Sequence, residues 1–248
     1  GFSADYDLGN DTAYAETCAS IGMVLWNYRL LLLHGEGRFA DVLERALYNG
    51  VLSGVSLQGD KFFYVNPLAS RGRHHRQAWY GCACCPTNVV RILPSLGGYI
   101  YAQNNEGVFV NLYVASTAEM AVKDNSIKLI QETRYPWSGK VKIRVEPATA
   151  ADFGVSLRIP GWCDAQTASV NGKPVTAVVE KSFIKIQRKW EQGDIIELDL
   201  PMVVRRVEAN PKVRADIGRI ALQRGPLVFC LEGVDHSGKV RNLALSRE

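Results

Sequence analysis

The sequence has 248 residues, of which 47% are hydrophobic and 22% are charged, and its net charge is +4. This length and composition indicate a globular protein with a sizeable core, in one large domain or two ordinary ones. The charges lie in mixed-sign segments, so we expect no nucleic-acid partner. The longest aliphatic run covers residues 30–33. A bilayer needs roughly 20 apolar residues, so we also expect no membrane partner.

The first hundred residues carry a helical pattern. Asp11 or Thr12 can cap a first helix, and Gly35 ends it. The spacing of three and four predicts a buried stripe made of Ile21, Val24, Leu25, Tyr28, Leu31 and Leu32. A second helix is predicted over about residues 38–57, forming a hairpin with the first. Its inner face is predicted to be Phe39, Val42, Leu43, Ala46, Leu47 and Leu52.

A third helix is predicted to begin at Pro86 and to end before Gly97, because proline suits the first helical position. The residue before a proline is disfavoured in the helical conformation, so we expect Cys85 just outside this helix. Cys84 and Cys85 then lie at a helix N-terminus. The helix dipole and the free N–H groups there favour a thiolate over a thiol.

After Gly98 the apolar period changes to two, which indicates strands. Strands are predicted at residues 108–114, 127–129, 141–145, 155–159, 183–186, 195–200 and 220–222. Asn171-Gly172 is a strong hairpin signal. We therefore predict an α+β protein with a helical domain over residues 1–98 and a β-sandwich over residues 99–248.

The six cysteines are unevenly placed, and three of them fall within the C-A-C-C-P stretch at residues 82–86. Adjacent cysteines pair with each other only under strain, so this cluster indicates metal ligands or catalytic thiolates. Two of the others, Cys163 and Cys230 in the β region, are expected to be buried and free. A histidine pair, His74 and His75, is expected in an exposed polar loop rather than at a metal.

Glu16 and Cys18, together with Cys84 and Cys85, offer one carboxylate and three sulfurs, a set that Zn²⁺ accepts in tetrahedral geometry. Residues two apart on a regular helix point about 200° away from each other. Glu16 and Cys18 can therefore share a metal only where the helix is irregular. The alternative is that Glu16 stabilises a first helical turn while the cysteines pack as small hydrophobic residues.

Several stretches resemble one enzyme family: residues 5–22 (DYDLGNDTAYAETCASIG), 62–68 (FFYVNPL), 79–88 (WYGCACCPTN), 158–163 (RIPGWC) and 221–229 (ALQRGPLVF). They are similar to the signature stretches of glycoside hydrolase family 127. The resemblance implies closing helices of an (α/α)₆ barrel followed by β-sandwich domains. It also implies release of β-L-arabinofuranosyl units from arabinose-containing glycans, with retention of configuration.

The resemblance implies Zn²⁺ ligands at Glu16, Cys18, Cys84 and Cys85. Cys84 matches the catalytic nucleophile, while Tyr64, Cys82 and Glu16 would line the sugar site. The family's glutamate acid/base would lie immediately before Gly1. We therefore expect little or no activity from this chain alone, and a partner in the missing N-terminal part of the enzyme or in a second copy.

Two other functions stay open at this point. The chain could be a non-catalytic, zinc-stabilised module that binds a glycan or a partner chain, or a redox protein with reactive thiols. A reduced cysteine cluster without a visible signal peptide favours a cytoplasmic location, and export is the alternative.

Overall fold

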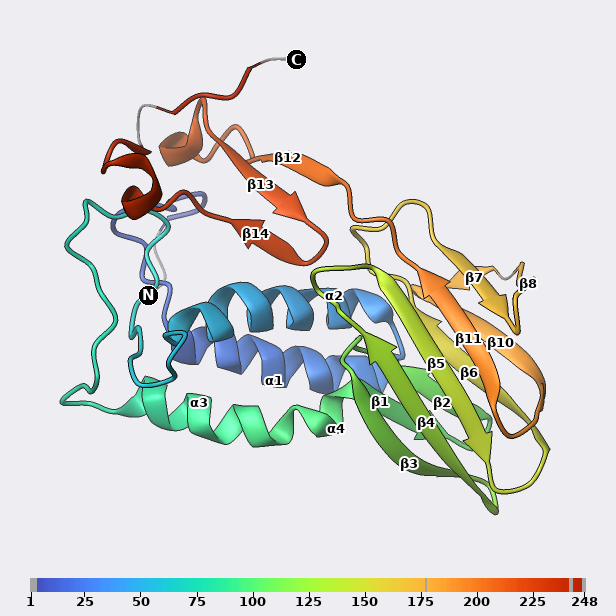
Figure 1. The fold of residues 1–248 in the computed structure, drawn as a ribbon. Helices are drawn as coiled ribbons and strands as arrows, with labels where there is room; N and C mark the ends of the chain where they lie inside the picture. Colours follow the sequence, from blue (N-terminus) through green and yellow to red (C-terminus); the bar gives the residue numbers. More distant parts are fainter. Residues whose placement is uncertain (1–3, 177, 241–242, 247–248) are drawn as a thin grey trace.

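The computed structural model describes residues 4–176, 178–240 and 243–246. Helices come first, two large β-sheets follow, and a small third sheet ends the described chain, as Figure 1 shows. The helical segments are α1 (Thr17–His34), α2 (Gly37–Ala46), a π-helical turn (Leu47–Val51), a 3-10 turn (Leu52–Gly54), α3 (Cys84–Ser95), α4 (Gly97–Ile100) and two later 3-10 turns (Arg214–Asp216 and Gly233–His236). The helical part followed by β-sheets confirms the predicted fold class.

α1 begins five residues later than its nearest predicted cap. Its N-cap is Glu16, with extended backbone angles, and Asp11 and Thr12 lie in a preceding turn. The reason is non-local, because Glu16 forms a β-bridge with Val65 that holds the chain extended. The end of α1 was predicted correctly, since Gly35 adopts φ 62° and its N–H donates to the Leu31 carbonyl at 2.8 Å.

The predicted buried stripe of α1 is wrong at two positions, because Leu25 is 43% exposed and Leu32 is 50% exposed. Apolar residues lie on every side of this helix, so spacing alone could not separate the packed face from the open one. In the second helix, Val42 and Leu52 are likewise exposed. The regular part of that helix ends at Ala46, and the chain continues through the π-helical and 3-10 turns instead.

α3 begins at Cys84, two residues before Pro86, so the prediction that Cys85 lies outside the helix is wrong. The N–H groups of a first helical turn have no partner within the helix, so a proline there removes no hydrogen bond. Both cysteines do lie at the N-terminus of α3, as predicted.

The strands are β1 (Tyr101–Asn104), β2 (Gly107–Val110), β3 (Ser116–Val122), β4 (Asn125–Thr133), β5 (Lys140–Pro147), β6 (Ala151–Arg158), β7 (Thr167–Val170), β8 (Lys173–Pro174), β9 (Val179–Glu180), β10 (Phe183–Trp190), β11 (Asp194–Asp199), β12 (Val204–Glu208), β13 (Ile220–Arg224) and β14 (Leu227–Phe229). Two sheets, ordered β1-β2-β6-β10-β9 and β3-β4-β5-β11-β7-β8, share one apolar core. The predicted Asn171-Gly172 hairpin joins β7 to β8, and both turn residues have positive φ.

β12, β13 and β14 form a separate antiparallel sheet, which the sequence pattern did not distinguish from the sandwich. This sheet is fastened to the helices by Asn49, whose amide nitrogen donates to the Pro226 carbonyl at 2.9 Å. Its amide oxygen accepts from the Val228 N–H at 2.9 Å. The β13–β14 hairpin is therefore held close to the π-helical turn.

The sandwich is joined to the helices by the buried Arg158 at the end of β6. Its guanidinium donates to Asp41 and to Glu44 of α2, each at 2.6 Å, and to the Asn111 carbonyl at 2.6 Å. Tyr135 donates to the same Glu44 oxygen at 2.7 Å. Burial works to lower the pKa of Arg158, but Glu44, Tyr135 and Asp41 together outweigh it and raise that pKa, so the guanidinium stays charged.

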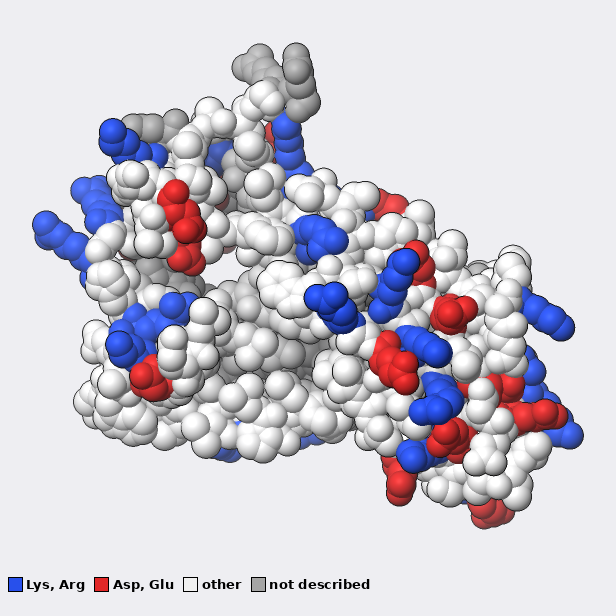
Figure 2. Space-filling view, in the orientation of Figure 1, with Lys and Arg blue, Asp and Glu red and all other residues white. Residues whose placement is uncertain are grey.

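Charged side chains are unevenly distributed over the face drawn in Figure 2. They are dense over the sandwich, where both signs alternate, and sparse over the strip formed by the helices. Among the described residues, no helix combines the length and the apolar character needed to cross a membrane.

Candidate metal centre

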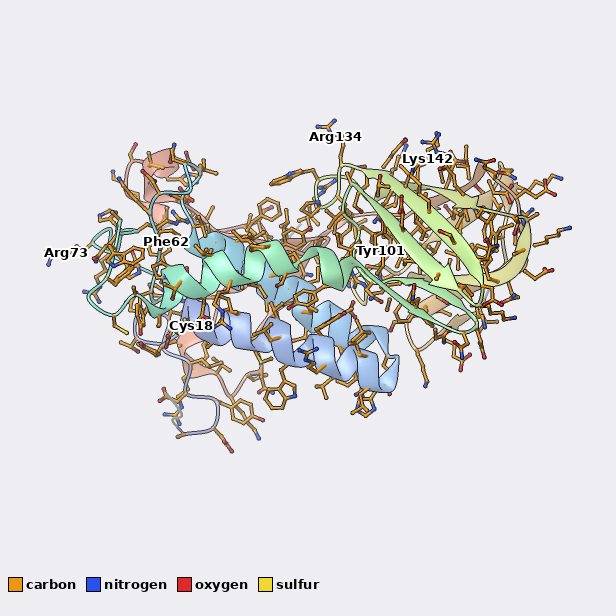
Figure 3. The ribbon with its side chains drawn as sticks, turned by 90° about the horizontal axis from the view of Figure 1, so that it is seen from below. Cys18, Phe62, Arg73, Tyr101, Arg134 and Lys142 are labelled. Atoms are coloured by element: carbon orange, nitrogen blue, oxygen red, sulfur yellow. The ribbon has the colours of Figure 1, made fainter. Side chains whose placement is uncertain are left out.

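The four predicted metal ligands come from the starts of two helices. Glu16 is the extended N-cap of α1 and Cys18 is the second residue of that helix, while Cys84 and Cys85 open α3. Because Glu16 is not helical, its side chain and that of Cys18 can face the same point. In Figure 3, Cys18 lies at the N-terminal end of α1, beside the start of α3.

The ligand atoms of this cluster all lie within 4.8 Å of one another. The Cys18 sulfur is 3.4 Å from the Cys84 sulfur and 3.3 Å from the Cys85 sulfur. Cys84 and Cys85 are separated by 3.8 Å between their sulfurs. The Glu16 Oε1 atom lies 3.5 Å from the Cys84 sulfur and 3.7 Å from the Cys85 sulfur.

These separations can be tested against a tetrahedral metal site. With Zn–S bonds of about 2.3 Å and a Zn–O bond of about 2.1 Å, the edges of a tetrahedron are about 3.8 Å between sulfurs and about 3.6 Å between sulfur and oxygen. The five distances given above agree with these edges to within about half an ångström, and the sixth, between Glu16 and Cys18, is at most 4.8 Å. The residues therefore fit a tetrahedral cation held by three sulfurs and a carboxylate, a set suited to Zn²⁺.

The electrostatics of the cluster also require a cation if the sulfurs are to be ionised. Burial, and then the hydrogen bond with Cys18, raise the pKa of the Cys85 thiol above its ordinary value in the protein without a metal. Four groups that repel one another when ionised are thus packed together. A bound divalent cation reverses this balance, because it deprotonates coordinating thiols.

The loop segment 62–66 runs alongside the start of α1 and closes one side of the cluster. The Thr17 N–H donates to the Tyr64 carbonyl at 3.0 Å, and the Asn66 N–H donates to the Ala15 carbonyl at 2.8 Å. The fully buried Thr17 hydroxyl donates to the Phe63 carbonyl at 2.9 Å and accepts from the Asn66 amide at 2.8 Å. These hydrogen bonds fix the position of Tyr64 relative to the metal ligands.

Tyr64 is brought directly against Cys84, with 3.0 Å between its hydroxyl oxygen and the sulfur. The hydrogen bond with Cys84, and then burial, raise the pKa of Tyr64 above its ordinary value, so the phenol stays protonated. Cys82 is exposed and within hydrogen-bonding reach of the same hydroxyl. The structure thus gathers Tyr64 and Cys82 beside the four predicted ligands.

Two further residues contact the ligands and were not predicted. The Asn88 amide donates to the Cys18 sulfur at 3.2 Å, and the Tyr14 phenol lies beside Glu16, where burial and then that carboxylate raise its pKa. The position of Asn88, four residues after Cys84 on one helix, was the available signal, since such residues share a face. Tyr14 gave no such signal, because the Ala15 N–H donates to the Ala13 carbonyl and turns the chain at Tyr14.

Cys163, Cys230 and the two histidines lie outside the group of metal ligands. All six cysteines are free thiols, and Cys163 is buried as predicted. Cys230 is exposed, so its predicted burial is wrong, because it follows the short edge strand β14 at the surface. His74 and His75 are exposed, and the His74 ring is 2.7 Å from the Val65 carbonyl, outside the group of metal ligands.

Sequence comparisons match three successive parts of the chain to one family. The β-L-arabinofuranosidase GH127 catalytic domain matches residues 1–98, the GH127 middle domain matches residues 107–202, and the GH127 C-terminal domain matches residues 204–248. The chain belongs to glycoside hydrolase family 127. The resemblance seen in the sequence is therefore confirmed over nearly all of its length.

Family 127 proteins similar to this chain are considerably longer than it is. A non-reducing end β-L-arabinofuranosidase from Bifidobacterium longum is 42% identical over 264 residues, which cover 99% of this chain and 39% of that protein. The crystal structure of a GH127 β-L-arabinofuranosidase from Geobacillus stearothermophilus T6 superposes with a TM-score of 0.90 at 50% identity, covering 94% of this chain and 39% of that one. Another solved GH127 β-arabinofuranosidase gives a TM-score of 0.91 at 49% identity, with the same coverage.

Proposed function

We propose that this chain forms the metal-binding half of a retaining β-L-arabinofuranosidase site, in which Cys84 is the nucleophile. The observation that supports this most is the position of the Cys84 sulfur. It occupies one corner of a cluster that fits Zn²⁺ and also contacts the hydroxyl of Tyr64. The two β-L-arabinofuranosidases named above supply the substrate class, an arabinofuranoside.

The surroundings of the three sulfurs favour Cys84 as the reactive one. Cys85 is fully buried, and Cys18 already accepts a hydrogen bond from the Asn88 amide. Cys84 is only partly buried and faces Tyr64. When bound, Zn²⁺ would supply the positive charge that keeps the sulfurs ionised at neutral pH. The N-terminus of α3 adds its dipole at the same place.

In the proposed reaction the Cys84 sulfur attacks the anomeric carbon of the sugar while the glycosidic C–O bond breaks. The departing oxygen takes a proton from a carboxylic acid on the opposite face of the sugar. The carboxylate left behind then takes a proton from water as the water oxygen attacks the same carbon, the C–S bond breaks, and the Cys84 thiolate is restored. Two displacements at one carbon retain the configuration. Tyr64, Cys82 and Glu16 would contact the sugar from the side of the metal.

We further propose that residues 1–98 are closing helices of an (α/α)₆ barrel and that the remainder of the enzyme covers their open face. Trp26 and Leu33 on α1 are 64% and 75% exposed, and Val90 on α3 is 64% exposed. A helix that is apolar on every side is normally buried. Other catalytic-domain helices are the expected partner, and a second copy of the chain is the alternative.

A second function, a non-catalytic zinc-stabilised module for a glycan or a partner chain, is favoured by one feature. Four protein ligands complete a tetrahedral set, which is typical of structural zinc sites, whereas catalytic zinc sites keep a position open. This second function predicts that Cys84 never reacts with a sugar. The first function predicts that it does, because its sulfur and not a metal-bound water is the nucleophile.

The experiment that separates the two uses a dinitrophenyl β-L-arabinofuranoside, whose leaving group departs without a proton. The chain is loaded with Zn²⁺, the metal content is measured, and peptides are analysed by mass spectrometry. We expect one bound metal per chain and a pentosyl unit on Cys84, lost in Cys84→Ser and kept in the control Cys163→Ser. Metal binding without a sugar adduct would favour the non-catalytic module, and absence of a metal would remove both proposals.

A further inference from the structure

Asn88 is the only described residue outside the ligands and Tyr64 for which a hydrogen bond to a cluster sulfur is resolved. It lies on α3, one turn after Cys84 and Cys85, and its amide nitrogen is 3.2 Å from the sulfur of Cys18 on α1. The contact therefore crosses between the two helices that supply the ligands. An ionised sulfur accepts hydrogen bonds and cannot donate them, so the amide N–H must be the donor.

The Asn88 donor matters because the cluster carries excess negative charge. Three thiolates and one carboxylate around a dication leave an excess of two negative charges. Hydrogen bonds from neighbouring groups to the ligand atoms are the usual way in which proteins disperse such an excess and fix ligand orientation. Glu16 has Tyr14 as such a neighbour, Cys84 has Tyr64, and Cys18 has Asn88.

Cys18 and Cys84 have different hydrogen-bonding neighbours, an amide on a helix and a phenol on a loop, and this difference distinguishes the two ligands. Asn88 is carried by a rigid helix and reaches Cys18 across the helix interface. Tyr64 is carried by the loop segment 62–66 and belongs to the proposed sugar site. A ligand held by a helix-borne amide is suited to stay on the metal, whereas one that faces a sugar-binding phenol is suited to leave it.

We propose that Asn88 is a positioning residue that holds Cys18 permanently on the cation, so that Cys84 is the sulfur freed for attack. This inference rests on the proposed metal site. It concerns which sulfur stays bound, and it assigns no contact between Asn88 and the sugar. It predicts that loss of the amide N–H weakens the metal site itself, before any substrate is present.

Two replacements of similar shape test this inference, because each preserves the packing of α3. Asn88→Leu removes both polar atoms, and Asn88→Asp replaces the donor with a negative charge beside the Cys18 sulfur. The matched control is Asn49→Leu, since the Asn49 side chain bonds, among the described residues, only backbone groups of Arg45, Pro226 and Val228. Metal affinity is measured by competition with a chromophoric chelator for Zn²⁺. The sulfur-to-metal charge-transfer band is recorded with Co²⁺, and unfolding is followed by thermal melting.

We expect Asn88→Leu to bind Zn²⁺ roughly 10- to 100-fold more weakly than the wild type, and Asn88→Asp to bind more weakly still. The Co²⁺ band should shift in both. Asn49→Leu should lower the melting temperature and leave metal affinity and the Co²⁺ band unchanged. If the wild type binds metal and both Asn88 variants match its affinity and band, the inference is overturned while the metal site stands. If the wild type binds no metal, the proposed function itself fails.

Discussion

Replacing Arg158 with methionine tests what joins the helices to the sandwich. The guanidinium is fully buried and donates to two carboxylates and one carbonyl, all at 2.6 Å. Methionine fills much of the volume but leaves Glu44 buried with only Tyr135 as a partner. Removing one member of a buried ion pair costs about 3–5 kcal/mol. In a chain of this size 1 kcal/mol corresponds to roughly 2–4 °C, so the melting temperature should fall by about 6–20 °C.

Differential scanning calorimetry is the suitable assay, because it also shows whether the helices and the sandwich still unfold together. The control is Lys185→Met, which removes a pair with Glu106 at 2.7 Å whose side chains are 48% and 72% exposed. An exposed pair is worth at most about 1 kcal/mol. The double variant Arg158→Met with Glu44→Leu should recover most of the loss, since no unpaired charge remains. If Arg158→Met melts within a degree or two of the control, the Arg158 ion pairs contribute little to stability and the reasoning is refuted.

Three smaller changes have expected outcomes that thermal melts can check. Gly107→Ala should destabilise the sandwich by roughly 1–3 kcal/mol, because a Cβ atom on Gly107 would lie 2.0 Å from the Gly154 carbonyl oxygen across the β2–β6 pair. Gly22→Ala, in the middle of α1 with open space around it, should stabilise the chain by up to about 1 kcal/mol, and an equal loss would contradict the helical geometry there. Burial works to raise the pKa of Asp194, but the hydrogen bonds from the Glu191 N–H and the Asn171 amide, together with the charge of Arg188, outweigh it and lower that pKa. The stability that Asp194 contributes is therefore present above the unfolded pKa of about 4 and is lost as the pH falls through the lower folded pKa, so Asp194→Asn should flatten the loss on acidification.

How far the sequence predicts this fold depends on whether the deciding contact is local. The Asn171-Gly172 hairpin was predicted correctly because both residues tolerate positive φ and the turn depends on nothing else. The start of α1 was missed because a β-bridge between Glu16 and Val65 sets it, across a long stretch of chain. Leu25 could not be placed, since the neighbours that cover one face of an apolar helix are themselves distant in sequence.

The metal ligands were predictable for chemical reasons and their supporting residues were not. Cysteine is rare, so three cysteines within residues 82–86 are informative by themselves, and the family resemblance adds Glu16 and Cys18. Asparagine and tyrosine are common and serve many roles, so Asn88 and Tyr14 gain a meaning only when the structure shows their contacts. The sequence indicates which atoms bind the metal, and the coordinates are needed to show what orients them.

Arg158 is connected to the metal site through α2 and the segment that carries Tyr64. Arg158 holds α2 through Asp41 and Glu44, and α2 continues without a break through the π-helical and 3-10 turns to Val55. Val55 bridges Phe62, whose segment carries Tyr64 to Cys84. A displaced α2 would therefore pull on the segment that carries Tyr64, whereas the four metal ligands lie at the starts of α1 and α3. For that reason Arg158→Met should disturb the Tyr64–Cys84 contact more than it disturbs metal affinity, which labelling of Cys84 and chelator competition on the same folded sample can compare.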